Sequence, residues 1–130
     1  MDITNYTSAI QSVSITKAYS DFSTAATTNT INLMNLPAQA SLVSITAETT
    51  VPFRWAGNGT ITLSTTSNWL SYTPLETGIG EIQSKWVDPP YFNSATSAFT
   101  VQATMTSTDS NLTSLTTGSF EFTIQYLLYT

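Results

Sequence analysis

Short runs of alternating apolar and polar residues follow one another along most of the chain. Successive side chains of a β-strand point to opposite faces, so a run of this kind predicts a strand buried on one face. Phe99, Val101, Ala103 and Met105 form the strictest run, in which each apolar residue is followed by Thr or Gln. The alternation predicts strands over 11–18, 30–36, 42–47, 51–55, 61–63, 99–106 and 120–126.

Residues typical of turns separate most of these runs. Pro37 ends the second run, because proline cannot donate a ladder hydrogen bond. Gly57-Asn58-Gly59 reads as a tight turn and predicts a hairpin that joins 51–55 to 61–63. Thr117 and Gly118 predict a turn before the last strand, and Asp109 to Asn111 predict one after 99–106.

The stretch from Thr65 to Ser94 is less regular than the rest of the chain. We expect one or two short strands in it, one of them near 81–87. A connection of this length inside a compact domain is usually functional or carries structure of its own. Aromatic residues crowd it, and prolines and glycines interrupt it: Trp69, Tyr72, Trp86, Tyr91 and Phe92, with Pro74, Gly78, Gly80, Pro89 and Pro90.

These elements predict an all-β chain. No window of 11 residues or more keeps apolar residues at helical spacing without interruption by Gly, Pro or Thr clusters. Seven or eight strands separated by turn signals are typical of an antiparallel β-sandwich, and a jelly roll is the specific expectation. Neither a linker nor an internal repeat is visible, so one domain over 1–130 is expected.

Composition argues against catalysis. The chain has no Cys and no His, which removes disulfides, thiolate nucleophiles, imidazole bases and the usual ligands of zinc, copper and haem. We therefore expect no enzyme and no cofactor. Glu76 and Glu81 lie in a Gly-containing loop and could serve as acid and base, although two solvated carboxylates are the favoured interpretation. Asp109, Ser110 and Asn111 lack the acidic spacing of a calcium loop.

Charge excludes further classes of partner. Only 8% of the residues are charged, the net charge is −5, and Lys17, Arg54 and Lys85 are the only cations. Nucleic-acid binding needs clustered Lys and Arg, so we expect neither a nucleic acid nor an anionic membrane surface as a partner. No stretch approaches 18 apolar residues, which predicts no membrane span. The first residues lack the basic and apolar regions of a secretory signal, so we expect synthesis in a cytoplasm.

A surface rich in hydroxyls and poor in charge favours assembly, because it loses little on desolvation against a partner. Trp and Tyr are enriched at the centres of interfaces. These residues could thus form an interface with a partner; in an alternative of equal weight, Trp69 and Trp86 fill the core. In a third, Trp69, Trp86 and Tyr91 stack on sugars. The expected partner interface consists of Trp69, Trp86, Pro89, Pro90, Tyr91 and Phe92.

Residues 18–43, AYSDFSTAATTNTINLMNLPAQASLV, resemble a pattern of small structural proteins of tailed bacteriophage virions. Residues 111–126, with a Thr-rich turn and a closing aromatic strand, fit the same pattern, whereas 51–92 departs from it. The resemblance implies a virion component without catalytic residues.

Within that group, the expectation is a capsid decoration or cement protein. It would bind the major capsid protein or other virion proteins at the outer shell, as a symmetric oligomer such as a trimer. The protein would then be made in the host cytoplasm and end in the virion. The alternative is a receptor- or carbohydrate-binding module associated with the tail or a head fibre.

Overall fold

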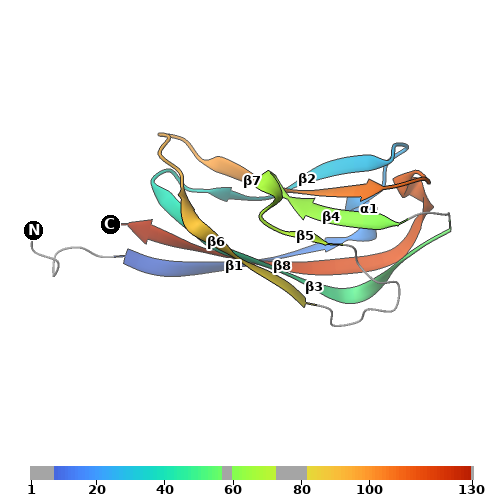
Figure 1. Ribbon diagram of the computed structural model, residues 1–130, viewed down its shortest axis with the longest axis horizontal. Helices are drawn as coiled ribbons and strands as arrows, with labels where there is room; N and C mark the ends of the chain where they lie inside the picture. Colours follow the sequence, from blue (N-terminus) through green and yellow to red (C-terminus); the bar gives the residue numbers. More distant parts are fainter. Residues whose placement is uncertain (1–7, 57–59, 73–81, 130) are drawn as a thin grey trace, which may run out of the picture.

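Two antiparallel four-stranded sheets face each other in the computed structural model, which describes residues 8–56, 60–72 and 82–129 (Figure 1). The first sheet has the strand order β1-β8-β3-β6, and the second has the order β2-β7-β4-β5. The strands of the first sheet are β1 (Ser8–Ala18), β3 (Ala40–Trp55), β6 (Ile82–Phe92) and β8 (Leu115–Tyr129). Those of the second are β2 (Thr28–Leu36), β4 (Ile61–Thr65), β5 (Ser71–Tyr72) and β7 (Phe99–Ser107).

The pairing of the strands defines the topology. Strand β1 pairs with β8, β2 with β7, β3 with β6, and β4 with β5. The first strand therefore pairs with the last, the second with the seventh, and so on inward, as in one long hairpin that is rolled up into two sheets. This is the jelly-roll arrangement. The predicted antiparallel sandwich and its jelly-roll topology are confirmed.

Short helices connect some of the strands. Helix α1 (Tyr19–Phe22) follows β1, η2 (Thr66–Asn68) follows β4, and η3 (Leu112–Ser114) precedes β8. In the described part of the chain, none of the helices has the length and apolar character needed to cross a membrane.

The core fills the space between the sheets with aliphatic and aromatic side chains. The rings of Phe53 and Phe120 stack with their centroids 4.3 Å apart. Helix α1 adds Phe22, whose ring meets Phe120 edge-on at 6.3 Å. The largest fully buried side chains are Phe22, Phe53, Phe120, Phe122, Leu36, Leu42, Ile45, Ile61, Leu63, Met105, Leu112 and Ile124.

Most expected strands are confirmed, several of them with longer bounds. The runs over 11–18, 30–36, 99–106 and 120–126 lie in β1, β2, β7 and β8. The expected strand near 81–87 is β6, and the run over 61–63 is β4.

The separation of 42–47 from 51–55 is wrong, because both lie in the single strand β3. Among the described residues, β8 is the partner of β3 beyond Glu48, and the register between them shifts on both sides of Val51. A proline at such an irregular position removes few ladder hydrogen bonds, so Pro52 does not end the strand.

The hairpin predicted between 51–55 and 61–63 is also wrong, although its turn residues 57–59 lie outside the described residues. Strands β3 and β4 belong to different sheets. The residues flanking this connection bind the β7–β8 connection instead: the Ala56 N–H donates to the Ser114 carbonyl at 2.9 Å, and Thr108 N–H to the Thr60 carbonyl at 3.0 Å. The chain here crosses between layers, which apolar alternation alone does not distinguish from a hairpin.

Gly118 does not form the predicted turn. It is buried within β8 and has a φ of 141°. A Cβ atom at this position would overlap the ring of Phe53. The glycine is therefore required by the close approach of an aromatic ring to the backbone.

Candidate interaction surface

Three of the aromatic side chains near the irregular segment pack together between the two sheets. The ring of Tyr91 lies 5.4 Å from that of Trp69 and 5.0 Å from that of Phe99, and Trp69 and Phe99 are 6.4 Å apart. All three are partly buried and pack against the core. Because Tyr91 comes from β6 and Phe99 from β7, this aromatic cluster joins the two layers.

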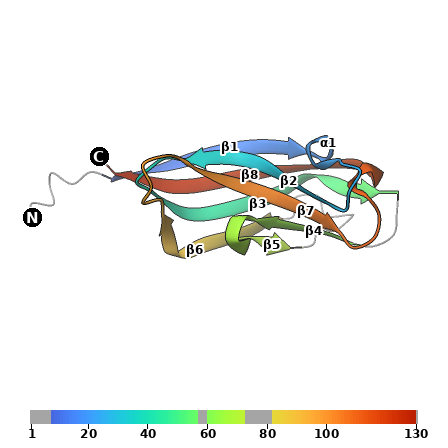
Figure 2. The same ribbon diagram turned by 90° about the horizontal axis from the view of Figure 1, so that it is seen from above.

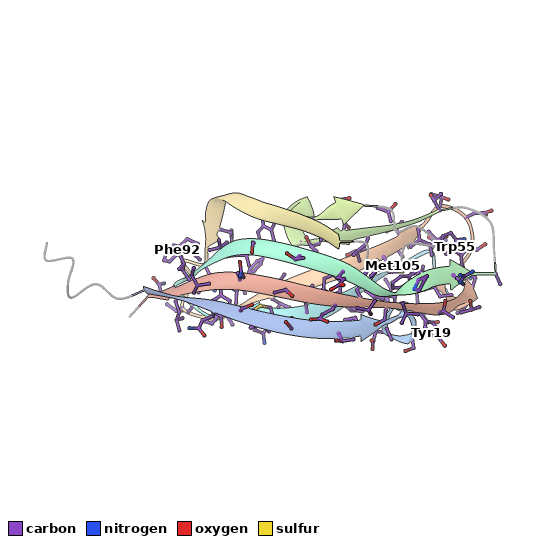
Figure 3. The ribbon with its side chains drawn as sticks, turned by 90° about the horizontal axis from the view of Figure 1, so that it is seen from below. Tyr19, Trp55, Phe92 and Met105 are labelled. Atoms are coloured by element: carbon purple, nitrogen blue, oxygen red, sulfur yellow. The ribbon has the colours of Figure 1, made fainter. Side chains whose placement is uncertain are left out.

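Phe92 differs from its neighbour Tyr91. It is 45% exposed, and Figure 3 places it at the end of the sandwich where β1 begins, opposite the end that carries Trp55. A partner could therefore contact Phe92 directly, whereas it would reach Trp69 and Tyr91 only through their exposed edges.

For Trp86, Pro89 and Pro90 the structure describes the backbone of β6. Tyr91 is paired with Leu42 and Trp86 with Ser44, so Val43 alone spans the part of β6 from Val87 to Pro90. The two prolines thus lie in an irregular segment of an edge strand, where missing N–H donors interrupt few ladder bonds. The interface role of the six expected residues stays a prediction.

Replacing Trp69 with alanine tests whether the aromatic cluster stabilises the fold. Loss of a partly buried indole from the aromatic cluster should lower the free energy of unfolding by about 2 kcal/mol. Phe92→Ser, at the more exposed ring, should lower it by less than Trp69→Ala does. Urea denaturation of both variants measures the difference; equal small losses would show that the indole does not support the fold.

A second surface has no counterpart among the expected site residues. The charged residues of the strands all belong to the first sheet, and none lies within the described bounds of β2, β4, β5 or β7. Those on strands are Lys17, Glu48, Arg54, Lys85, Asp88 and Glu121. The net charge of −5 is therefore distributed entirely outside the strands of the second sheet.

The outward side chains of this second sheet are hydroxyls and amides. They form what we call the uncharged face, defined by Thr28, Thr30, Asn32, Asn35, Thr62, Ser64, Thr100, Gln102, Thr104 and Thr106. The side chains that alternate with them along β4 and β7 are mostly buried in the core.

Cross-strand hydrogen bonds order the uncharged face. The hydroxyls of Thr30 and Thr104 lie 2.8 Å apart, and those of Thr28 and Thr106 lie 3.1 Å apart. Further along, Gln102 Nε2 donates to Asn32 Oδ1 at 2.9 Å, and the Thr100 hydroxyl to Asn35 Oδ1 at 3.0 Å. Side chains that already bond to one another lose little freedom when a partner covers them.

The outer side of the first sheet is different in character. Glu48 on β3 and Glu121 on β8 lie directly opposite each other there. Like charges in this position repel each other and stay hydrated. The two broad sides of the sandwich are thus electrostatically unequal.

A signal for the uncharged face exists in the sequence. The segments 22–47, 55–75 and 89–108 contain no charged residue, and β2, β4, β5 and β7 lie in them. Alternation shows which residues of each segment point outward. It does not show that these separate segments meet in one sheet, so the surface becomes visible only with the topology.

The other candidates for chemistry gain no support. Glu76 and Glu81 lie outside the described residues. Among the residues that the structure does describe, no three Asp or Glu side chains are grouped so that they could hold a metal ion.

No family model and no curated protein matches this chain. Several solved structures match it in fold. A chain in the capsid of cyanophage Pam1 aligns over 95% of this chain and 85% of its own length, with 17% identity and a TM-score of 0.58. A chain in the acid-stable capsid of Helicobacter pylori bacteriophage KHP30 gives the same identity and TM-score, over 95% of this chain and 93% of that one.

A chain in the capsid of Ralstonia phage GP4 aligns over 91% of this chain and 83% of its own length, with 14% identity and a TM-score of 0.53. This chain shares its fold with chains of phage capsids. The alignments span at least 91% of this chain and 83% of each capsid chain, so the shared fold is the whole sandwich and not one sheet of it.

Proposed function

We propose that this protein is a structural component of a bacteriophage virion, a decoration protein that binds the outer surface of the capsid shell through its uncharged face. The observation that carries the proposal is the separation of charge between the two sheets. The shared fold with chains of phage capsids and the resemblance of 18–43 and 111–126 to phage structural proteins support the same role.

The uncharged face suits this role for an energetic reason. Burying an unpaired charge costs several kcal/mol, whereas hydroxyls and amides can exchange water for a polar partner at little net cost. A sheet face whose side chains are already hydrogen-bonded to one another also binds without reordering them. The outer side of the first sheet, with Glu48 and Glu121, then stays in solvent.

Binding of this kind would stabilise a shell by mass action. A protein that binds the assembled state and not the free subunits shifts the equilibrium toward assembly. Contacts that cross the junctions between capsid subunits would oppose internal pressure from packaged nucleic acid. The protein would act as a symmetric oligomer, for which the sequence suggested a trimer and the β1 edge, uncovered in the described part of the chain, favours a dimer.

Electron microscopy of particles assembled without this chain tests the proposal. We expect shells that lack density on their outer surface and that release their contents at a lower temperature than complete particles. Adding the purified chain back should restore both properties. Intact shell surfaces together with altered tails or fibres would contradict the capsid assignment and favour the tail- or fibre-associated alternative.

A further inference from the structure

Strand β1 presents a long, regular and uncovered edge. It pairs with β8 over all of its 11 residues, from Ser8 opposite Tyr129 to Ala18 opposite Ser119, without a shift in register. In the described part of the chain no strand pairs with its other side. Figure 2 shows β1 at the margin of the sandwich, on the side opposite β5 and β6. The outer N–H and C=O groups of such an edge are free to pair with another strand.

The other three edges carry features that prevent pairing. Strand β6 contains Lys85, Asp88, Pro89 and Pro90, and its register with β3 is interrupted. Within the described residues, strand β5 has 2 residues. Strand β2 has a register shift between Asn32 and Met34. Charges, prolines, short length and bulges are the known protections of edge strands, and β1 has only Lys17 near its end.

The sequence of β1 identifies what would cover this edge. Two antiparallel copies related by a two-fold axis through Ser14 place Gln11 opposite Lys17, Ser12 opposite Thr16, and Val13 opposite Ile15 of the second copy. Ser14 of one copy lies opposite Ser14 of the other. Each of the seven positions from Gln11 to Lys17 then meets a residue of its own kind: a hydroxyl meets a hydroxyl, a branched aliphatic meets a branched aliphatic, and a long polar chain meets another.

An isologous interface requires such self-complementarity, because each contact occurs twice with the roles exchanged. The burial pattern also agrees with this register. Ser12, Ser14 and Thr16 are exposed, whereas Gln11, Val13, Ile15 and Lys17 are partly buried, so paired residues lie on the same side of the sheet. The edge ends at Ala18, whose N–H donates to the Asp21 carboxylate at 2.8 Å.

We propose that a second copy of this chain pairs with β1, antiparallel and centred on Ser14, to join two first sheets into one continuous sheet. The two-fold axis is perpendicular to that sheet, so both uncharged faces point the same way. This pairing closes after two copies and gives a dimer, in place of the trimer expected from the sequence. The inference does not depend on the proposed function, since it concerns the chain alone.

Single cysteines test the register, because the natural chain contains none. Directly opposed Cα atoms of antiparallel strands lie about 4.5–5.5 Å apart, within the range that a disulfide bridges. Ser14→Cys should therefore form a covalent dimer under mild oxidation. Ser12→Cys alone should not, because its two copies would be about 13 Å apart, but an equimolar mixture of Ser12→Cys and Thr16→Cys should crosslink.

Thr123→Cys is the matched control, since it places a thiol beside Ser14 on the inner neighbour β8. Crosslinking of Ser12→Cys alone, or equal crosslinking of Ser14→Cys and Thr123→Cys, would overturn the proposed register. A mass of one or three copies for the natural chain, measured by analytical ultracentrifugation at tens of micromolar, would overturn the proposal itself.

A charge at the two-fold axis gives an independent measurement. Ser14→Lys places two ammonium groups opposite each other, so the dissociation constant of the dimer should rise at least about tenfold. Thr123→Lys should leave it within about twofold. Both substitutions are on outward side chains, and a thermal melt confirms that each variant is folded. An unchanged dissociation constant for Ser14→Lys would contradict the pairing.

Discussion

Gly118→Ala is expected to lower the free energy of unfolding by about 3–5 kcal/mol. Two effects add. The backbone at Gly118 has a φ of 141°, which side-chain-bearing residues rarely adopt. In addition, the new methyl group would occupy the position of the Phe53 ring. The ring cannot retreat, because it is fully buried and stacks on Phe120.

Urea denaturation of the variant measures this loss, and two further variants identify its origin. Ser119→Ala, one residue along β8, should change the stability by less than about 0.5 kcal/mol. Combining Gly118→Ala with Phe53→Leu should cost at least about 1 kcal/mol less than the sum of the single variants, since the smaller side chain leaves room for the methyl group. Strict additivity would show that the ring and the glycine do not constrain each other.

Asn93→Asp is expected to cost about 4 kcal/mol, although it changes one nitrogen to oxygen. The Asn93 side chain is 2% exposed and donates to three carbonyls: Leu36 at 3.2 Å, Pro37 at 3.1 Å and Ser97 at 3.0 Å. Its Oδ1 accepts from the Ala95 N–H at 3.2 Å. The amide thus ties the β2–β3 connection to the β6–β7 connection. A carboxylate would turn these attractive contacts with carbonyl oxygens into repulsion.

Thermal and urea unfolding check this expectation, with Asn111→Asp as the control. Asn111 is exposed in the β7–β8 connection, so the same chemical change there should alter stability by less than about 0.5 kcal/mol. Similar losses for the two variants would mean that Asn93 does not hold the connections together.

Alternation of apolar residues was sufficient to predict the fold class and the positions of most strands. It failed where contacts between distant segments determine the local structure. The runs over 42–47 and 51–55 were expected as two strands but form one, and Gly118 was expected in a turn, but a ring from another strand requires it. The crossing from β3 to β4 was read as a hairpin because alternation does not specify which sheet a strand joins.

The surface was predictable only in part. Sequence composition indicates a charge-poor protein that works by assembly, and it directs attention to the aromatic residues of 65–94. Trp69 and Tyr91 belong to a cluster that packs against the core. The uncharged face depends on three separate segments that pairing brings together, and the β1 edge depends on knowing which strands remain unpaired. Both properties are consequences of topology.

Titration of the purified chain onto particles that lack it tests the central claim most directly. Thr104→Lys introduces a charge at the middle of the uncharged face, on β7 between Thr30 and Ser64. Thr123→Lys makes the same change on β8 between Ser14 and Thr46, on the outer side of the first sheet. Both threonines are partly buried and lie between hydroxyl side chains on a central strand, so the two variants are matched.

We expect the natural chain and Thr123→Lys to saturate the particles with similar dissociation constants. Thr104→Lys should bind at least about tenfold more weakly, because its ammonium group would be buried without a partner. Equal binding of the two variants would contradict a docking role for the uncharged face. Failure of the natural chain to bind the shell would contradict the assignment as a capsid decoration protein and favour the tail- or fibre-associated alternative.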